Sequence, residues 1–136
     1  MIFSDGGARG NPGHAAVAFV AYSVEGHLLK RYSRYIGYRT NNQAEYEALI
    51  AGLEFAVTVN AKEVSCFLDS QLVAKQLNGE YLVRNFELKK LWKKIQDLKK
   101  VFNEVRFTNV PRTNPNIEKA DQLLNEALDK KELHSK

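Results

Sequence analysis

Ser4-Asp5-Gly6-Gly7-Ala8-Arg9-Gly10-Asn11-Pro12-Gly13 is the stretch from which the fold of this chain can be worked out. Residues 1–5 predict a short strand that ends at Asp5, and residues 14–24 predict a second strand of small and apolar side chains. Glycine puts no side chain in the way of a ligand, so residues 6–13 are expected to form a loop that a bulky ligand can approach. The stretch therefore predicts two antiparallel strands, joined by a ligand-facing loop that starts beside a carboxylate.

The segments that follow predict one mixed sheet flanked by helices. A turn signal at Glu25-Gly26 places a third antiparallel strand over residues 28–38. Apolar spacing then predicts, in order, a helix, a strand, two helices, a strand and a helix, over 41–59, 64–68, 70–77, 88–102, 105–110 and 116–128. We expect an α/β fold with a five-stranded mixed sheet, in which three antiparallel strands precede two further strands. A single catalytic domain should span residues 1–129, followed by a polar, frayed tail over 130–136.

Length and charge narrow the class of protein. The 136 residues suffice for one domain with a core of its own, and no apolar run is long enough to span a bilayer. No signal peptide is apparent, and the one cysteine, Cys66, lies in an apolar stretch, so a reducing cytoplasm is the expected setting. Residues 81–112 carry nine Lys or Arg against three acids, although the net charge of the chain is only +4. A local basic excess of this kind suits a polyanionic substrate.

Four acidic residues lie where a predicted strand ends or a predicted helix begins. Asp5 and Asp69 follow predicted strands, and Glu45 and Asp121 lie near the starts of predicted helices. Burial of an unpaired carboxylate costs several kcal/mol, roughly, so such groups usually have a cationic partner. No matching basic residues lie nearby in the sequence, and ligation by oxygen alone favours Mg²⁺ or Mn²⁺ over zinc. The set predicts a metal-dependent enzyme that acts on phosphates.

Each of these residues also has a purely structural explanation. Glu45 and Asp121 could compensate helix dipoles, and Asp69 could cap the helix that follows it. Asn41 and Asn42 are plausible caps for the helix over 41–59. The lysine-rich face of the helix over 88–102 is either a solvated surface or a substrate-binding surface. The four acids are therefore informative as an ordered set, and weakly so when taken singly.

Four segments together resemble the ribonuclease H type 1 family. They are Asp5-Gly-Gly-Ala-Arg-Gly-Asn-Pro-Gly13, Thr40-Asn-Asn-Gln-Ala-Glu45, Asp69-Ser-Gln71, and Val110-Pro-Arg112 with Ala120-Asp121. The resemblance runs from the first strand to the last helix and implies the ribonuclease H-like fold. Residues 81–86 lead directly into a helix, so the chain is similar to the prokaryotic-type branch that lacks an inserted basic handle.

The resemblance implies endonucleolytic hydrolysis of the RNA strand of RNA–DNA hybrids, leaving 3′-hydroxyl and 5′-phosphate ends. Asp5, Glu45, Asp69 and Asp121 would hold two Mg²⁺ ions, for which Mn²⁺ could substitute. The protein would be a cytoplasmic monomer that binds the hybrid and no membrane. By the same likeness, the expected substrate-binding residues are Arg9, Gly10, Asn11, Thr40, Asn41, Asn42, Gln71 and Arg112.

The segment before Asp121 departs from the family pattern. Related loops often carry a histidine, which is absent here, and an asparagine four residues before the last acid, where this chain has Ile117. A one-residue insertion that moves the asparagine to Asn116 would explain the difference. Two rival functions stay open at this point: a non-catalytic binder of hybrid or double-stranded RNA, and a nuclease directed at junction DNA.

Overall fold

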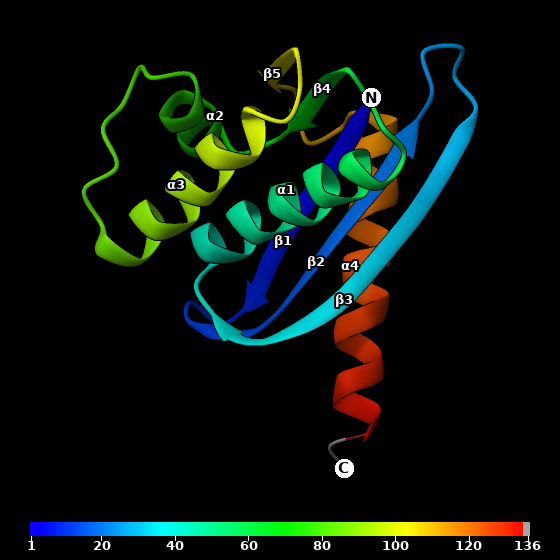
Figure 1. Ribbon diagram of the computed structural model, residues 1–136. Helices are drawn as coiled ribbons and strands as arrows, with labels where there is room; N and C mark the ends of the chain where they lie inside the picture. The colour runs from blue at the N-terminus through cyan, green and yellow to red at the C-terminus, as the bar shows by residue number, and fades with distance from the viewer. Residues whose placement is uncertain (135–136) are drawn as a thin grey trace.

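The computed structural model describes residues 1–134, which form five strands and four helices (Figure 1). The strands and helices follow one another along the chain in the predicted order β-β-β-α-β-α-α-β-α. In chain order they are β1 (Ile2–Arg9), β2 (Gly13–Tyr22), β3 (Leu28–Arg39), α1 (Asn41–Thr58), β4 (Glu63–Leu68), α2 (Gln71–Leu77), α3 (Phe86–Lys99), β5 (Glu104–Asn109) and α4 (Pro115–His134).

The strands form one mixed sheet in the order β3-β2-β1-β4-β5. β1 and β3 are both antiparallel to β2, whereas β4 runs parallel to β1 and to β5. Short turns can join only the antiparallel strands, and the parallel strands require helical crossovers. The predicted five-stranded mixed sheet is confirmed.

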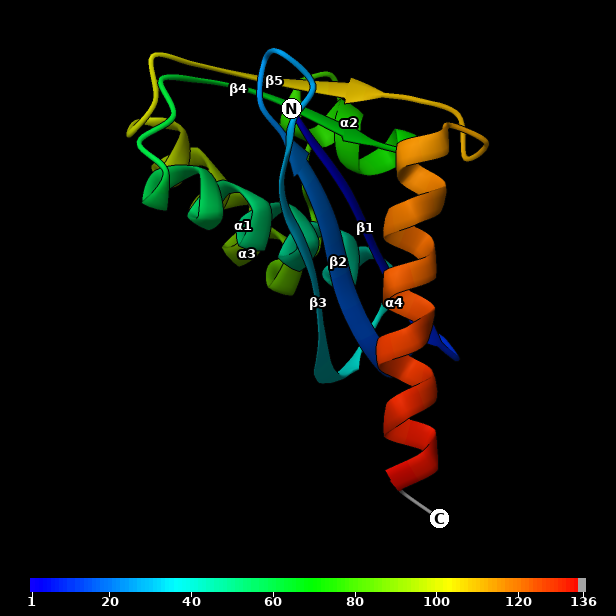
Figure 2. The same cartoon turned by 90° about the vertical axis from the view of Figure 1, so that its right-hand side faces the viewer.

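Helices cover both faces of the sheet (Figures 1 and 2). Helices α1, α2 and α3 lie on one face, and α4 lies alone on the other. Successive side chains of β2 point to opposite faces of the sheet. Phe19 packs in the cluster with α1 on one face. Ala16 and Ala18 pack against α4 on the other face, through Leu124 and Leu128. β2 is thus buried on both faces, which explains why its sequence is apolar almost throughout.

The glycine-rich stretch is mostly strand, so the loop predicted over residues 6–13 is wrong. Gly6 to Arg9 continue β1 and pair with Val17 to His14 of β2, which leaves a tight turn over residues 10–12. Gly6 is needed for packing: a Cβ atom built there would lie 2.1 Å from the carbonyl oxygen of Ala44. The glycine therefore lets the backbone of α1 approach β1 directly.

Residues other than those expected cap the helices. Thr40 caps α1 by accepting from the Gln43 N–H, in a capping box with the Gln43 side chain, so neither Asn41 nor Asn42 is the cap. Ser70, rather than Asp69, caps α2. Since Asp121 is the seventh residue of α4, it also lies beyond the first turn, where the helix dipole acts most strongly. The structural explanations for Asp69, Asp121 and the asparagines therefore fail.

Helix α4 extends further than predicted. It continues through Asp129 to His134, so the residues expected to fray are helical, whereas residues 135–136 of the expected tail lie outside the described residues. Leu124 and Leu128 anchor its middle on the sheet. Within residues 1–134, no helix or strand intervenes between Leu77 and Phe86, which agrees with the predicted absence of an inserted handle. None of the helices described here is long and apolar enough to cross a membrane.

Candidate active site

Four carboxylates meet in one cleft of about 480 Å³. Asp5 lies within β1, Glu45 lies in α1, Asp69 follows β4 directly, and Asp121 lies in α4. Asp5, Glu45 and Asp69 each offer an oxygen atom, and these oxygens all lie within 4.8 Å of one another. Asp121 also lines the cleft, from α4 on the other face of the sheet from α1. The fold therefore brings together all four acids that the sequence singled out.

Backbone packing explains how Asp5 and Glu45 come so close. Gly6 follows Asp5, and its close approach to Ala44 puts the next residue of α1, Glu45, over the strand. The Gly6 N–H donates to Glu45 Oε1 at 3.4 Å. Asp69 joins the pair because β4 is the parallel neighbour of β1 and Phe67 pairs with Phe3, so the residues two positions further along, Asp69 and Asp5, lie at the same level.

The cleft makes ionisation of its carboxyl groups unfavourable. Burial, and then the charge of Asp69, raise the pKa of Asp5 to about 8. Burial and the neighbouring Asp5 raise the pKa of Glu45 well above its ordinary value. Burial also raises the pKa of Asp69, although the nearby Arg112 guanidinium opposes that shift. Three carboxyl groups that repel one another in a desolvated cleft resist ionisation, and a cation bound between them would favour their ionised forms.

The donor set fits a hard divalent cation. Asp5 and Glu45 are buried, with 7% and 8% of their surfaces exposed. Glu45 Oε2 is buried and has no hydrogen-bond partner among residues 1–134. A buried, unpartnered acceptor beside two further carboxylates matches the all-oxygen coordination that Mg²⁺ and Mn²⁺ prefer.

The expected substrate-binding residues fall into two groups. Arg9, Asn41 and Arg112 line the cleft with the four acids. The others are outside its lining: Gly10, Asn11, Thr40, Asn42 and Gln71.

Asn41 nevertheless ties the start of α1 to the β1–β2 turn. Its Oδ1 accepts from the Ala8 N–H at 2.8 Å, and its own N–H donates to Asn11 Oδ1 at 3.0 Å. The turn and the start of α1 are therefore connected by hydrogen bonds beside the cleft.

The structure does not support the idea that Asn116 takes the place of the asparagine found in related loops before the last acid. Asn116 Oδ1 accepts from the Tyr22 hydroxyl at 3.0 Å, and Ile117 is buried against Phe3 and Val20. Asn116 is also outside the lining of the cleft. Asn125, which sequence reasoning missed, does line it, and its position one helical turn after Asp121 is the signal that could have identified it.

Comparisons with known proteins decide the family. The family described as Reverse transcriptase-like matches residues 3–127. Ribonuclease H of Campylobacter concisus is 35% identical over 135 residues, an alignment that covers 93% of this chain and 91% of that protein. The chain belongs to the ribonuclease H family. The predicted family resemblance is thus confirmed.

Two further relatives are longer than this chain. Ribonuclease HI of Halobacterium salinarum is 42% identical over 127 residues, covering 93% of this chain and 63% of that protein. The bifunctional protein Rv2228c of Mycobacterium tuberculosis is 39% identical over 130 residues, covering 95% of this chain and 35% of that protein. The chain therefore spans about a third of the mycobacterial protein and under two thirds of the archaeal one.

Solved structures agree with the fold of this chain. RNase H1 from Halobacterium salinarum superposes with a TM-score of 0.91 at 42% identity, covering 95% of this chain and 96% of that one. LC11-RNase H1, isolated from compost by a metagenomic approach, was solved in complex with RNA/DNA hybrid. It superposes with a TM-score of 0.88 at 42% identity, again covering 95% and 96% of the two chains.

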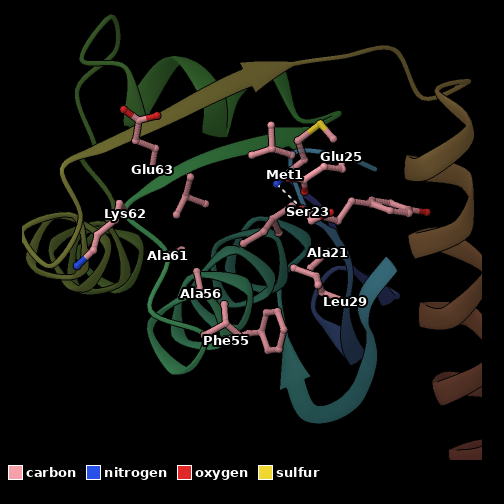
Figure 3. Close-up of a pocket in the computed structure, with 15 residues that line it drawn as sticks. Met1, Ala21, Ser23, Glu25, Leu29, Phe55, Ala56, Ala61, Lys62 and Glu63 are labelled. Atoms are coloured by element: carbon pink, nitrogen blue, oxygen red, sulfur yellow. Dashed lines mark hydrogen bonds between the residues drawn. The ribbon is translucent and has the colours of Figure 1, made fainter. Parts of the chain in front are cut away.

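A second cavity, of about 560 Å³, lies among different residues (Figure 3). Apolar side chains such as Met1, Leu29 and Phe55 dominate its lining, while Lys62 and Glu63 point away from them. None of the four carboxylates lines it. The cavity is larger than the acidic cleft, but it lacks the cluster of carboxylates that could hold a metal ion.

Proposed function

We propose that this protein is a metal-dependent endoribonuclease that hydrolyses the RNA strand of RNA–DNA hybrids. The observation that carries the proposal is the cluster of Asp5, Glu45 and Asp69 oxygens within 4.8 Å, with Asp121 in the same cleft. Membership of the ribonuclease H family supports the reaction, and the LC11-RNase H1 complex with RNA/DNA hybrid supports the substrate.

The four carboxylates would hold Mg²⁺, with Mn²⁺ as a substitute. Two ions per site, the number we propose, would activate a water molecule and stabilise the leaving 3′ oxygen, so that the products carry 3′-hydroxyl and 5′-phosphate ends. No nucleophilic side chain is needed. The buried walls around Asp5 and Glu45 would hold these ligands in place and keep bulk water from competing for them.

Residues around the cleft would position the hybrid. Arg112 lies on the cleft and could contact a phosphate of the RNA strand through its planar guanidinium. The β1–β2 turn and the start of α1 are coupled through Asn41, so their backbone and amide groups form one recognition surface. Only the 2′-hydroxyl distinguishes RNA from DNA in the strand to be cut, and such donors and acceptors can read it. Gly10, Asn11, Thr40, Asn42 and Gln71 would extend this surface.

The decisive experiment is cleavage of an end-labelled RNA–DNA hybrid beside single-stranded RNA, duplex RNA, duplex DNA and junction DNA. Reactions would contain Mg²⁺, Mn²⁺ or EDTA, with the wild type and Asp69→Asn. We expect metal-dependent cutting of the RNA strand of the hybrid alone. Removal of a direct ligand should lower the rate by more than the roughly 10–100-fold typical of outer partners. Labelling of the product ends tests the end chemistry.

Size measurement in solution and localisation in the source cell would test the proposed monomer and the proposed cytoplasmic setting. Binding of the hybrid by folded wild type without cleavage under either metal would refute the enzyme and favour a binding module. Preferential cutting of junction DNA would refute the substrate while leaving the metal chemistry intact.

A further inference from the structure

Arg9 is bound to the far end of α4. It ends β1, four residues after Asp5, and its Nη2 lies 2.7 Å from Asp129 Oδ1. Its Nη1 lies 2.6 Å from Glu132 Oε1. Nη2 also donates to Asn125 Oδ1 at 3.3 Å. A single guanidinium group therefore meets two carboxylates and one amide along two turns of the same helix, a geometry that suits its planar array of donors.

Asn125 connects this cluster to the active site. Its Nδ2 donates to the backbone oxygen of Asp121 at 3.0 Å and to Asp121 Oδ2 at 3.3 Å. Arginine offers donors only and an ionised carboxylate offers acceptors only. The amide of Asn125 therefore satisfies both neighbours in one orientation, with Oδ1 toward Arg9 and Nδ2 toward Asp121.

We propose that Arg9 and Asn125 are positioning residues, which together hold the Asp121 carboxylate in the orientation that binds the metal. Asp129 and Glu132 anchor the arrangement, so the last turns of α4 belong to the support of the active site. The inference rests on the proposed function, since it assigns Asp121 as a metal ligand. Hydrogen bonds from outer residues commonly fix the orientation of metal-binding carboxylates.

This role differs from the direct contact with substrate that the family resemblance implied for Arg9. Two carboxylates already pair with its guanidinium, so the three groups together carry one net negative charge, which does not favour a phosphate. A substrate contact would lower affinity for the hybrid when lost and would leave metal binding unchanged. A positioning role would weaken metal binding and kcat and leave KM nearly unchanged.

The test uses the full chain with Asn125→Leu, Arg9→Met and Arg9→Lys. Leucine keeps the size of asparagine approximately and removes both hydrogen-bonding groups. Arg106→Met is the matched control, because Arg106 also pairs two nitrogens with a carboxylate, that of Glu104, but on β5 and outside the cleft lining. Calorimetric titration with Mn²⁺ measures metal affinity without turnover, and steady-state cleavage of the hybrid separates kcat from KM. Thermal unfolding checks that each variant is folded.

We expect Asn125→Leu to weaken Mn²⁺ binding and lower kcat by about 10-fold or more, with KM within about 2-fold. Arg9→Met should change the same two quantities less, and Arg9→Lys should recover part of the loss. Arg106→Met should match the wild type in Mn²⁺ affinity and kcat, since attraction of the substrate by the basic segment acts on neither. Unchanged Mn²⁺ affinity in both Asn125→Leu and Arg9→Met would overturn the proposal, and so would an increase in KM alone. Should Asn125→Leu fail to fold, Arg9→Met at its more exposed position still decides the question.

Failure of the proposed function is distinguishable from failure of this inference. If the wild type binds Mn²⁺ but cuts no hybrid, the reaction is wrong, while the calorimetric comparison still tests the positioning role. If the wild type cuts hybrid and the variants equal it in metal affinity and kcat, the positioning role alone is wrong.

Discussion

The carboxyl groups of Asp5, Glu45 and Asp69 carry raised pKa values because the fold withdraws them from solvent beside one another. Without metal, the folded protein therefore retains protons that the unfolded chain would release above pH 4, approximately. The binding of a cation and the binding of these protons are competing ways of relieving the same repulsion. A residue-scale consequence is that the stability of the protein should depend on pH and on metal together.

Stability in EDTA should fall as the pH rises. Burial and Asp69 raise the pKa of Asp5 from 3.8 to about 8, so between these values the folded state binds more protons than the unfolded state. The stabilising contribution of Asp5 is complete below pH 4, roughly, and is lost as the pH passes through about 8. Thermal unfolding in EDTA should show a smaller drop in Tm from pH 5.5 to pH 8 for Asp5→Asn than for wild type. Equal drops would show that Asp5 titrates normally in the fold.

Added Mg²⁺ should raise Tm more at pH 8 than at pH 5.5, because the metal replaces protons that are already lost at the higher pH. Asp5→Asn is the control, since removal of a metal ligand should abolish most of the rise in Tm that Mg²⁺ causes in the wild type. A shift in Tm that is independent of pH would contradict the competition between metal and protons.

At the scale of the elements, the site depends on how closely α1 approaches β1. A side chain at Gly6 would collide with the Ala44 carbonyl, whereas a Cβ atom at the neighbouring Gly7 would lie 3.8 Å from Leu124. Overpacking of a close contact typically costs about 1–3 kcal/mol. The contact between these two backbones is therefore expected to control both stability and the position of Glu45.

Gly6→Ala should lower the free energy of unfolding by about 1–3 kcal/mol or more and should also reduce cleavage, because α1 must shift and carry Glu45 with it. Denaturant unfolding measures the first effect and steady-state kinetics the second. Gly7→Ala is the matched control for stability, with an expected change of less than about 1 kcal/mol. Equal stability losses in the two variants would disprove the packing argument.

The last turns of α4 should matter to the active site although they lie far from Asp5 in the sequence. A chain that ends at Leu128 keeps all four carboxylates but loses Asp129 and Glu132. We expect it to fold and to show the reduced Mn²⁺ affinity of Arg9→Met. Arg9→Met in the shortened chain should add little, because both changes remove the same interaction.

A chain that ends at Leu133 retains both acidic partners of Arg9 and is the appropriate control. Its Mn²⁺ affinity should equal that of the full chain. Additive losses from the truncation and Arg9→Met would show that the last turns of α4 act independently of Arg9.

At the scale of the whole molecule, positive charge is concentrated in one segment, residues 81–112, from which Arg112 lines the acidic cleft. The lysines of α3 lie beside α1, and the ion pairs that they form are long, as in the 4.0 Å contact of Lys94 with Glu54. Exposed pairs at such distances contribute little to stability. Because its ion pairs are weak, the basic segment over residues 81–112 can attract a polyanion over a longer range.

Binding of the hybrid should weaken by at least about 10-fold between 50 and 200 mM salt, because bound counterions are released from the phosphates. Asp69→Asn in EDTA would allow the measurement without cleavage. Lys93→Gln on α3 should reduce the dependence of log Kd on log salt concentration, whereas Glu126→Gln on α4 should not. A salt-independent Kd would exclude an electrostatic contribution of this surface.

Sequence patterns captured most of the fold, since the order of elements and the mixed sheet follow from local periodicity and turn residues. They misplaced the boundaries where tertiary contacts compete with local preference. Gly6 to Arg9 have little intrinsic preference for a strand, yet pairing with β2 makes them one. Likewise, the polar residues after Leu128 have no apolar pattern that predicts a helix, and the ion pairs of Arg9 stabilise them there.

By itself, the sequence determined the family, the element order and the four carboxylates, because each is encoded in side chains that are near neighbours along the chain. Only the tertiary structure decided that oxygens of three of these carboxylates lie within 4.8 Å of one another, and that Arg9 reaches Asp121 through Asn125. Distances across the sheet depend on strand order and on a backbone contact at Gly6, which no local pattern specifies. The pKa values are likewise a tertiary property, since burial and neighbouring charge exist only once the chain has folded.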